Sequence, residues 1–252
     1  MPPFNPLQAV ATIWGREIAD EPVFLGTCFA FRSRRNFLTA AHCVANLESR
    51  QLAVVNVGDE RKVIWRGVSG VERHPTADIA VLHTLPMSDE GRNTIGPEAA
   101  ATEDQTEGFQ GYVSNYGIGE DFHAYGFPEN IFGDEQRTPT PRLFKGHFQR
   151  FLEYESRHLQ YRYFAGEMSI PAPAGLSGGP LFRPSAPPIV TGLVTENLES
   201  TTFLDEQVEQ AVGHDAAQVT KYKRVISYGI ALMLDRVGDW VDEHAPDEPE
   251  TS

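Results

Sequence analysis

The chain has 252 residues, of which 40% are hydrophobic and 22% are charged. Its 21 Lys and Arg residues against 35 Asp and Glu residues give a formal net charge of -14 at pH 7, which argues against nucleic acid or an anionic membrane surface as the main partner. The N-terminus lacks a basic stretch followed by an apolar region, and no apolar run approaches the about 18 residues that a membrane span needs. We therefore expect no membrane contact and a cytoplasmic location.

The first half of the chain consists of short apolar runs separated by Gly, Pro and polar clusters, a pattern typical of β-strands. The expected strands cover residues 23–31, 37–39, 52–57, 62–68 and 79–82. The acidic, turn-rich segment 86–107 is the expected connection to the second half.

The second half continues this pattern and adds helical signals. Its expected strands cover residues 106–112, 122–125, 143–151, 160–164, 181–182 and 189–194. Apolar residues recur at helical spacing over 204–212 and again over 234–241, which predicts two helices that pack by their apolar faces. Many short strands with turns between them indicate a barrel or a sandwich.

Three short motifs each supply one side chain of a nucleophilic triad. His42 lies in the motif TAAHC, Asp78 opens the motif DIAVL, and Ser177 lies in the motif GLSGGP. A serine hydroxyl is a weak nucleophile until a neighbouring base takes its proton. We therefore assign His42 as the base, Asp78 as the acid that orients it, and Ser177 as the nucleophile.

The glycine-rich turn around Ser177 also suits acyl transfer, because backbone N–H groups must face the oxyanion that develops. Gly175 can adopt a backbone conformation closed to other residues, which turns its N–H toward the site, and the N–H of Ser177 is the second expected donor. The alternative is a plain turn between strands. His74 is the rival base, but it precedes Pro75 in a polar turn, and we expect it to be exposed.

The motifs TAAHC, DIAVL and SGGP, in this order, resemble those of the chymotrypsin-fold serine peptidases, and most of all the bacterial trypsin-like group. The resemblance covers residues 7–241 and implies an all-β fold of two antiparallel six-stranded β-barrels with a C-terminal helix. The N-terminal barrel is expected over residues 1–100, the second barrel with the helix over 101–241, and a flexible tail over 242–252. The resemblance implies no cofactor and no metal.

The two cysteines, Cys28 and Cys43, match the family's disulfide across the histidine loop. We expect this bridge in an oxidising setting, whereas a reducing cytosol would keep both residues as buried thiols. Two cysteines without clustered ligands are too few for a closed zinc site.

The residues six and five positions before the nucleophile are Pro171 and Ala172, where the trypsins have an Asp that binds a basic side chain. Neither residue neutralises Lys or Arg, so the resemblance does not imply trypsin specificity. A small or medium apolar residue before the scissile bond is the default expectation.

The same alignment places Thr195, Glu196 and Asn197 along the strand that borders the substrate, with Gly229 at the far wall of the pocket. We expect the side chain of Glu196 to point to solvent. The alternative is that it points into the cleft and favours a basic substrate residue.

Leu176 stands where zymogen-activated members carry the Asp that pairs with a new amino terminus. We expect no activation of that kind, and an oxyanion loop ordered by packing or by a partner. The segments 130–140 and 199–223 exceed what a minimal double barrel needs. They are expected to restrict access of the substrate or to dock a protein partner, the alternative being plain surface insertions.

The expected function is a serine endopeptidase that acts on protein or peptide substrates, and analogy with bacterial relatives suggests a stress or defence system. One alternative is a peptidase that stays inactive until an activating protein partner binds. The other is a peptide-binding module on the same fold that does not cleave.

Overall fold

The computed structural model describes residues 5–16, 22–57, 63–85, 108–128, 140–157, 159–183, 188–209 and 218–247. In this part of the chain, nearly all regular structure is antiparallel β-sheet. None of the described helices has the length and apolar character that crossing a membrane requires.

The N-terminal barrel has six strands in the order β1-β2-β3-β6-β5-β4, and the pairing of β4 with β1 closes it. Its strands are β1 (Val10–Gly15), β2 (Val23–Ala30), β3 (Asn36–Thr39), β4 (Leu52–Val57), β5 (Val63–Arg73) and β6 (Ala80–Thr84). A short helix α1 (Pro6–Ala9) precedes β1, and two 3-10 turns, η1 (Ala41–Val44) and η2 (Ser49–Gln51), follow β3.

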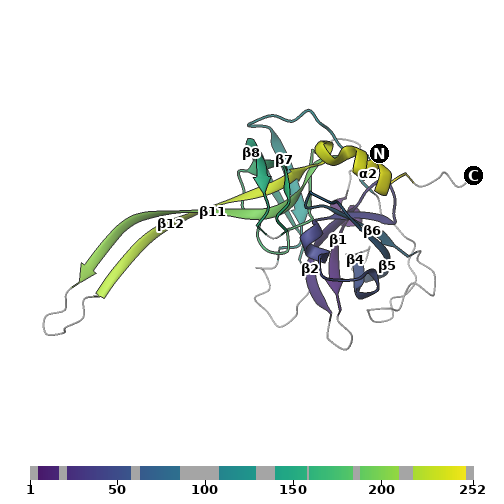
Figure 1. Cartoon of the computed structure of the whole chain (residues 1–252), viewed down its shortest axis with the longest axis horizontal. Helices are drawn as coiled ribbons and strands as arrows, with labels where there is room; N and C mark the ends of the chain where they lie inside the picture. Colours follow the sequence, from purple (N-terminus) through teal and green to yellow (C-terminus); the bar gives the residue numbers. More distant parts are fainter. Residues whose placement is uncertain are drawn as a thin grey trace, which may run out of the picture.

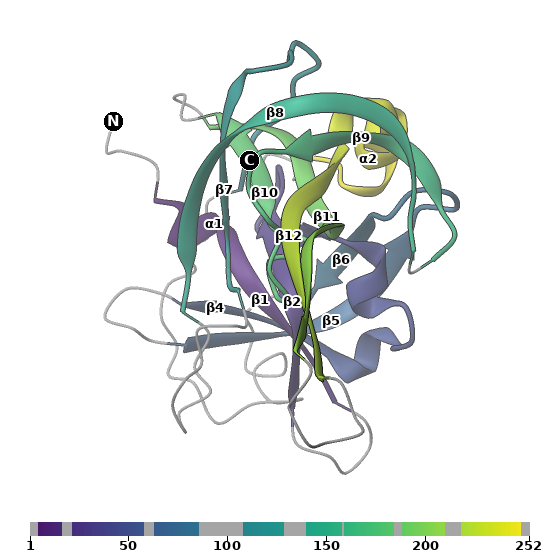
Figure 2. The ribbon, with the colours of Figure 1, turned by 90° about the vertical axis from the view of Figure 1, so that its left-hand side faces the viewer.

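The C-terminal barrel repeats the arrangement with the order β10-β11-β12-β9-β8-β7, closed by β7 against β10. Its strands are β7 (Asp121–Gly126), β8 (Arg142–Glu155), β9 (Arg162–Met168), β10 (Pro180–Arg183), β11 (Ile189–Glu209) and β12 (Gln218–Met233). The 3-10 turn η5 (Leu234–Val237) and helix α2 (Gly238–His244) follow β12. Figure 2 shows β8 and β9 curving over this barrel, opposite β4 and β5 of the first.

These barrels confirm the expected all-β double-barrel fold, and α2 confirms the C-terminal helix. Most expected strands are present within a few residues of their predicted bounds, whereas β1 and β12 were not predicted. The expected strand over 106–112 is reduced to isolated bridges at Phe109 and Tyr112. The expected connection 86–107 and residues 130–139 of the first insertion lie outside the described residues.

The expected helix over 204–212 is wrong, because residues 204–209 belong to β11 and residues 210–217 lie outside the described part. Leu204 and Val208 are four positions apart, a spacing that places two residues on one face of a helix but also on one face of a strand. The preceding Thr201, Thr202 and Phe203 favour the strand.

The outer parts of β11 and β12 form a two-stranded arm that projects away from both barrels (Figure 1). We define the arm as residues 198–209 and 218–228, which pair with each other from Leu198 opposite Tyr228 to Glu209 opposite Gln218. The partner strands stop at the barrel, since β10 pairs with β11 only as far as Leu193 and β9 pairs with β12 only from Gly229.

One hydrophobic core joins the two barrels. Phe109 lies between them and packs edge-on against Phe29 of β2, with ring centroids 5.5 Å apart, and at a tilt against Phe182 of β10, with ring centroids 5.4 Å apart. Phe29 and Phe109 are fully buried, and aromatic pairs of this kind stabilise beyond their buried area. The barrels therefore form a fixed pair, which holds segments from both at their interface.

Candidate active site

His42 and Asp78 lie just outside two paired strands of the N-terminal barrel. His42 lies in η1 directly after β3, and Asp78 lies two residues before β6, which pairs with β3. The backbone N–H of His42 donates to Oδ1 of Asp78 at 2.9 Å, and Nδ1 of the ring donates to Oδ2 at 2.7 Å. Asp78 has no exposed surface, so its carboxylate is fixed against His42 by two hydrogen bonds.

These contacts control the charge of His42. Burial by itself lowers the pKa of the imidazole, but the hydrogen bond to Asp78, with contributions from Cys43, outweighs burial and raises the pKa above its ordinary value of 6.5. Asp78 therefore fixes the tautomer of the ring and stabilises the imidazolium that proton transfer would create.

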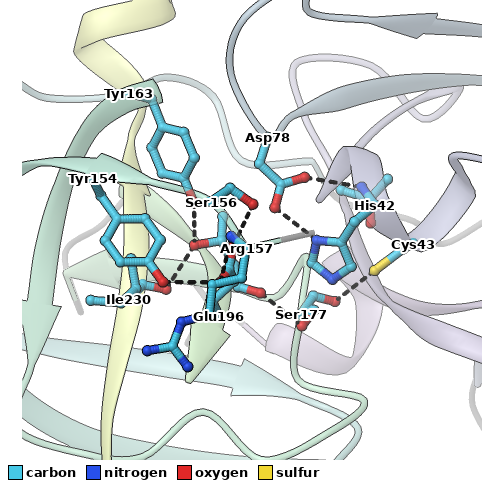
Figure 3. Close-up of polar contacts among 12 residues, drawn as sticks. His42, Cys43, Asp78, Tyr154, Ser156, Arg157, Tyr163, Ser177, Glu196 and Ile230 are labelled. Carbon is cyan, nitrogen blue, oxygen red and sulfur yellow. Dashed lines mark hydrogen bonds and ion pairs between the residues drawn. The ribbon is translucent and has the colours of Figure 1, made fainter. Parts of the chain in front are cut away.

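Ser177 lies in the turn before β10, and β2 of the other barrel holds this turn in place. The N–H of Thr27 donates to the carbonyl of Ser177 at 2.9 Å. In Figure 3 the His42 ring points from Asp78 toward Ser177. The structure thus brings together the three side chains of the expected triad.

The hydroxyl of Ser177 donates to the carbonyl oxygen of Thr195 at 3.0 Å. Thr195 lies in β11, so this bond joins the nucleophile to a strand of the C-terminal barrel.

The two expected oxyanion donors lie in the same turn. Gly175 has a φ of 85°, in the left-handed region that glycine adopts without strain. Among the backbone hydrogen bonds of the described residues, none is donated by the N–H of Gly175 or of Ser177. Between them, Leu176 is fully buried in the hydrophobic core of the C-terminal barrel, which supports ordering of this loop by packing.

Thr27 is a site residue that the sequence analysis missed. Its hydroxyl donates to the carbonyl of Gly175 at 2.7 Å and accepts from the N–H of Phe127 at 3.1 Å. Thr39 in turn donates to the carbonyl of Thr27 at 2.8 Å. A threonine inside an apolar strand resembles any other strand residue, so the sequence carried no signal for this role.

The turn also requires glycine at Gly178. Its φ is 84°, and a Cβ at this position would lie 2.0 Å from the carbonyl of Thr27 and 2.3 Å from the Thr39 hydroxyl. The close approach of the two barrels next to Ser177 therefore depends on the absence of a side chain at Gly178.

Thr195 connects the site to the C-terminal barrel. Its hydroxyl donates to the carbonyl of Ile230 at 3.0 Å and accepts from the hydroxyl of Tyr163 at 3.0 Å. Burial, and then the charge of Asp78, raise the pKa of Tyr163 far above its ordinary value, so the phenol remains a donor. These two hydrogen bonds of Thr195 fix the part of β11 whose carbonyl accepts a hydrogen bond from the Ser177 hydroxyl.

Four of the expected pocket residues lie close together. The N–H of Ala172 donates to the side-chain oxygen of Asn197 at 3.1 Å, and a Cβ on Gly229 would lie 3.3 Å from that of Ala172. Pro171 is exposed next to them. These residues bring no charge to this part of the site.

The expectation that Glu196 points to solvent is wrong. Glu196 is only 4% exposed, and its carboxylate accepts from the Tyr154 hydroxyl at 2.9 Å, from the Ser156 hydroxyl, and from the backbone N–H of Arg157 at 3.2 Å (Figure 3). A register shift in the pairing with β12 occurs between Val194 and Glu196, and such bulges re-aim side chains. Three donors offset the cost of burying the carboxylate.

Cys28 and Cys43 are both free and buried, so the bridge expected in an oxidising setting is not formed. The thiol of Cys43 points instead at the carbonyl of Ser177, 3.8 Å away. Burial raises the pKa of Cys28 well above its ordinary value, and the neighbouring Cys43 adds to the shift. Within the described ranges, no group of three or more His, Cys, Asp or Glu residues is arranged to hold a metal ion.

Comparison with known proteins agrees with this geometry. The family model described as the trypsin-like peptidase domain matches residues 26–186. A comparison with curated proteins gave no match.

Two bacterial proteins are among the solved structures with a similar fold. The active form of the Rv3671c protease from M. tuberculosis has 15% identity and a TM-score of 0.57, covering 98% of this chain and 85% of that one. Its inactive form has 16% identity and a TM-score of 0.54, with coverages of 95% and 90%. The apo MamO protease domain from Magnetospirillum magneticum has 14% identity and a TM-score of 0.58, with coverages of 93% and 96%.

The structural likenesses support the double-barrel fold, and the family match spans His42, Asp78 and Ser177 as well as more than half of the chain. The chain belongs to the trypsin-like peptidase family.

Proposed function

We propose that this protein is a serine endopeptidase that cleaves protein substrates through an acyl-enzyme on Ser177. The observation that carries the proposal is the pairing of His42 with the buried carboxylate of Asp78, with the ring directed at Ser177. A nucleophile, a base and a group that orients the base are the parts that acyl transfer needs.

The reaction follows from this arrangement. His42 takes the proton of the Ser177 hydroxyl as the oxygen attacks the scissile carbonyl, and the N–H groups of Gly175 and Ser177 receive the oxyanion. His42 then gives its proton to the leaving amine. In the second half it activates a water molecule, which releases the acyl group from Ser177.

Labelling with a fluorophosphonate probe tests the nucleophile directly. We expect the wild-type protein to be labelled and Ser177→Ala not to be labelled. Ser69→Ala should be labelled like the wild type, because Ser69 lies in β5 of the N-terminal barrel and its hydroxyl donates to the carbonyl of His83 in β6. Labelling of Ser177→Ala, or cleavage of a protein substrate by it, would contradict the proposal.

A second candidate is a peptidase that an activating protein partner switches on. One observation favours it: the arm projects away from both barrels, where a partner can reach it. We place such activity in the cytoplasm, a compartment consistent with the free thiols of Cys28 and Cys43.

The arm offers a clean test of this candidate. Glu199 and Ser227 are paired across the arm, so residues 200–226 can be replaced by a two-residue Asn-Gly turn. Labelling would be measured on purified protein and in a bacterial lysate. A switched peptidase is labelled faster in the lysate only when the arm is intact. Equal labelling of both forms in both settings means constitutive activity, and no labelling anywhere means a non-cleaving binding module.

A further inference from the structure

The loop that carries Asp78 is built around a histidine that the proposed reaction does not use. His74 directly follows β5, and its backbone N–H donates to the carbonyl of Ile79 at 3.0 Å. Inside this closed loop, the N–H of Ile79 donates to the carbonyl of Ala77 at 2.8 Å. Asp78 lies between these contacts, so the shape of the loop sets the direction of its carboxylate.

The side chain of His74 fills the loop from within. Its Nδ1 accepts two backbone hydrogen bonds, from the N–H of Thr76 at 3.1 Å and from the N–H of Ala77 at 2.9 Å. Nδ1 can accept them only while it carries no proton. The expectation that His74 is exposed is wrong, because the residue is half-buried and its ring accepts the hydrogen bonds that hold the turn before Asp78.

Helix α2 holds the His74 ring from the other side. The ring packs edge-on against Trp240 at 5.2 Å, and Trp240 stacks on His244 at 4.6 Å. Nδ1 of His244 donates to the carbonyl of Trp240 at 2.8 Å. The C-terminal helix of the second barrel thus reaches the loop of Asp78 in the first.

The charges around the ring favour its neutral form. Burial, and then the charge of His244 on α2, lower the pKa of His74 below its ordinary value. On the loop itself, the carboxylate of Asp78 is engaged by His42. The guanidinium of the preceding Arg73 donates to the carbonyls of Val44 and Leu47.

We propose that His74 is a positioning residue: its unprotonated Nδ1 holds the turn at Thr76 and Ala77 and thereby keeps Asp78 directed at His42. The proposal rests on the proposed function for its effect on rate, but the effect on the His42–Asp78 hydrogen bond does not depend on catalysis. Protonation of Nδ1 places its N–H against two other donors, which opens the turn and misaligns Asp78.

Acidification should weaken the contribution of His74 to stability and to activity. Because the pKa of His74 is lowered by folding, its contribution to stability is complete above pH 6.5 and is lost as pH falls through the folded-state pKa. Activity is therefore expected to fall below pH 6.5 by a step that belongs to His74, in addition to the effect of protonating His42.

Two substitutions separate this role from simple packing. In His74→Asn the amide oxygen replaces the accepting Nδ1, whereas His74→Leu fills similar space without an acceptor. His147→Leu is the matched control, since His147 is exposed on β8 of the other barrel. Each variant is assayed for kcat/KM against pH and for the far-downfield NMR signal of the Nδ1 proton of His42.

We expect His74→Leu to lose about 100-fold in kcat/KM, as small misplacements of catalytic groups do, and to shift or lose the His42 signal. His74→Asn keeps the signal and the activity at pH 7 and loses the step below pH 6.5. The proposal is overturned if His74→Leu keeps the wild-type signal, or if the step persists in His74→Asn. The pH profile of His74→Asn tests the proposal even if His74→Leu does not fold. The NMR signal of His42 tests it even if the wild type has no peptidase activity.

Discussion

Replacing Thr27 by Val removes one hydroxyl from the interface of the two barrels without changing the shape of the side chain. Thr27 has no exposed surface, and its hydroxyl lies between the carbonyl of Gly175 and the N–H of Phe127. Both partners lose their hydrogen bond in the variant. An unsatisfied buried group costs about 1–3 kcal/mol, so the free energy of unfolding should fall by about 2–6 kcal/mol.

The same change should reach the oxyanion site. The Thr27 hydroxyl holds the carbonyl of Gly175, and so fixes the loop that presents the N–H groups of Gly175 and Ser177. Loss of one oxyanion donor costs about 100–1000-fold in rate, so we expect a fall of about 100-fold in kcat with little change in KM.

The assay combines urea unfolding with steady-state kinetics on a peptide substrate, at a temperature where every variant is folded. Thr191→Val is the matched control, because Thr191 is equally buried and donates a single hydrogen bond, to Leu181 at 3.2 Å, away from Ser177. It should lose stability but keep its kcat. An unchanged kcat in Thr27→Val, with the expected loss of stability, would refute the link between Thr27 and the oxyanion loop.

Three further predictions test other parts of the site. Asp78→Asn should lower kcat by about 10,000-fold because the amide supports the wrong tautomer of His42, and a loss below tenfold in hydrolysis or labelling would contradict this. Gly178→Ala should lower the free energy of unfolding by about 2–5 kcal/mol through left-handed strain and overlap with Thr27, whereas Gly111→Ala, in open space, should be neutral in denaturant unfolding. Because the pKa of His42 is raised, kcat/KM should rise with pH through an inflection above 6.5, and a pH profile without an inflection above 6.5 is the contrary result. The contribution of His42 to stability is complete below pH 6.5 and is lost as pH rises through its folded-state pKa.

The parts of the site that could be predicted are those encoded in short stretches of sequence. His42 follows an apolar run, Asp78 directly precedes one, and Ser177 lies in a glycine-rich turn. The chemistry of these residue types is distinctive without knowledge of the fold. Most of the barrel strands, though not β1 and β12, could be predicted for the same reason, since short apolar runs and the turn residues between them are local signals.

The parts that could not be predicted depend on contacts between distant segments. Thr27 acts through Gly175, 148 positions away. Glu196 is turned inward by a bulge, and the hydroxyls that donate to its carboxylate, those of Tyr154 and Ser156, come from another part of the barrel. The false helix over 204–212 arose because an apolar spacing of four fits both a helix and a strand.

Within β11 and β12, the outer residues that form the arm should be less stable against local opening than the inner residues that belong to the barrel. Residues 198–209 and 218–228 are hydrogen-bonded to each other, and among the described strands no third one pairs with them. A two-stranded ribbon is only marginally stable by itself, so the arm should open locally without unfolding either barrel. Amide hydrogen exchange would therefore divide β11 near Asn197 and β12 near Gly229 into a slowly exchanging inner half and a rapidly exchanging outer half. A molecule that binds the arm would slow exchange in the outer half alone.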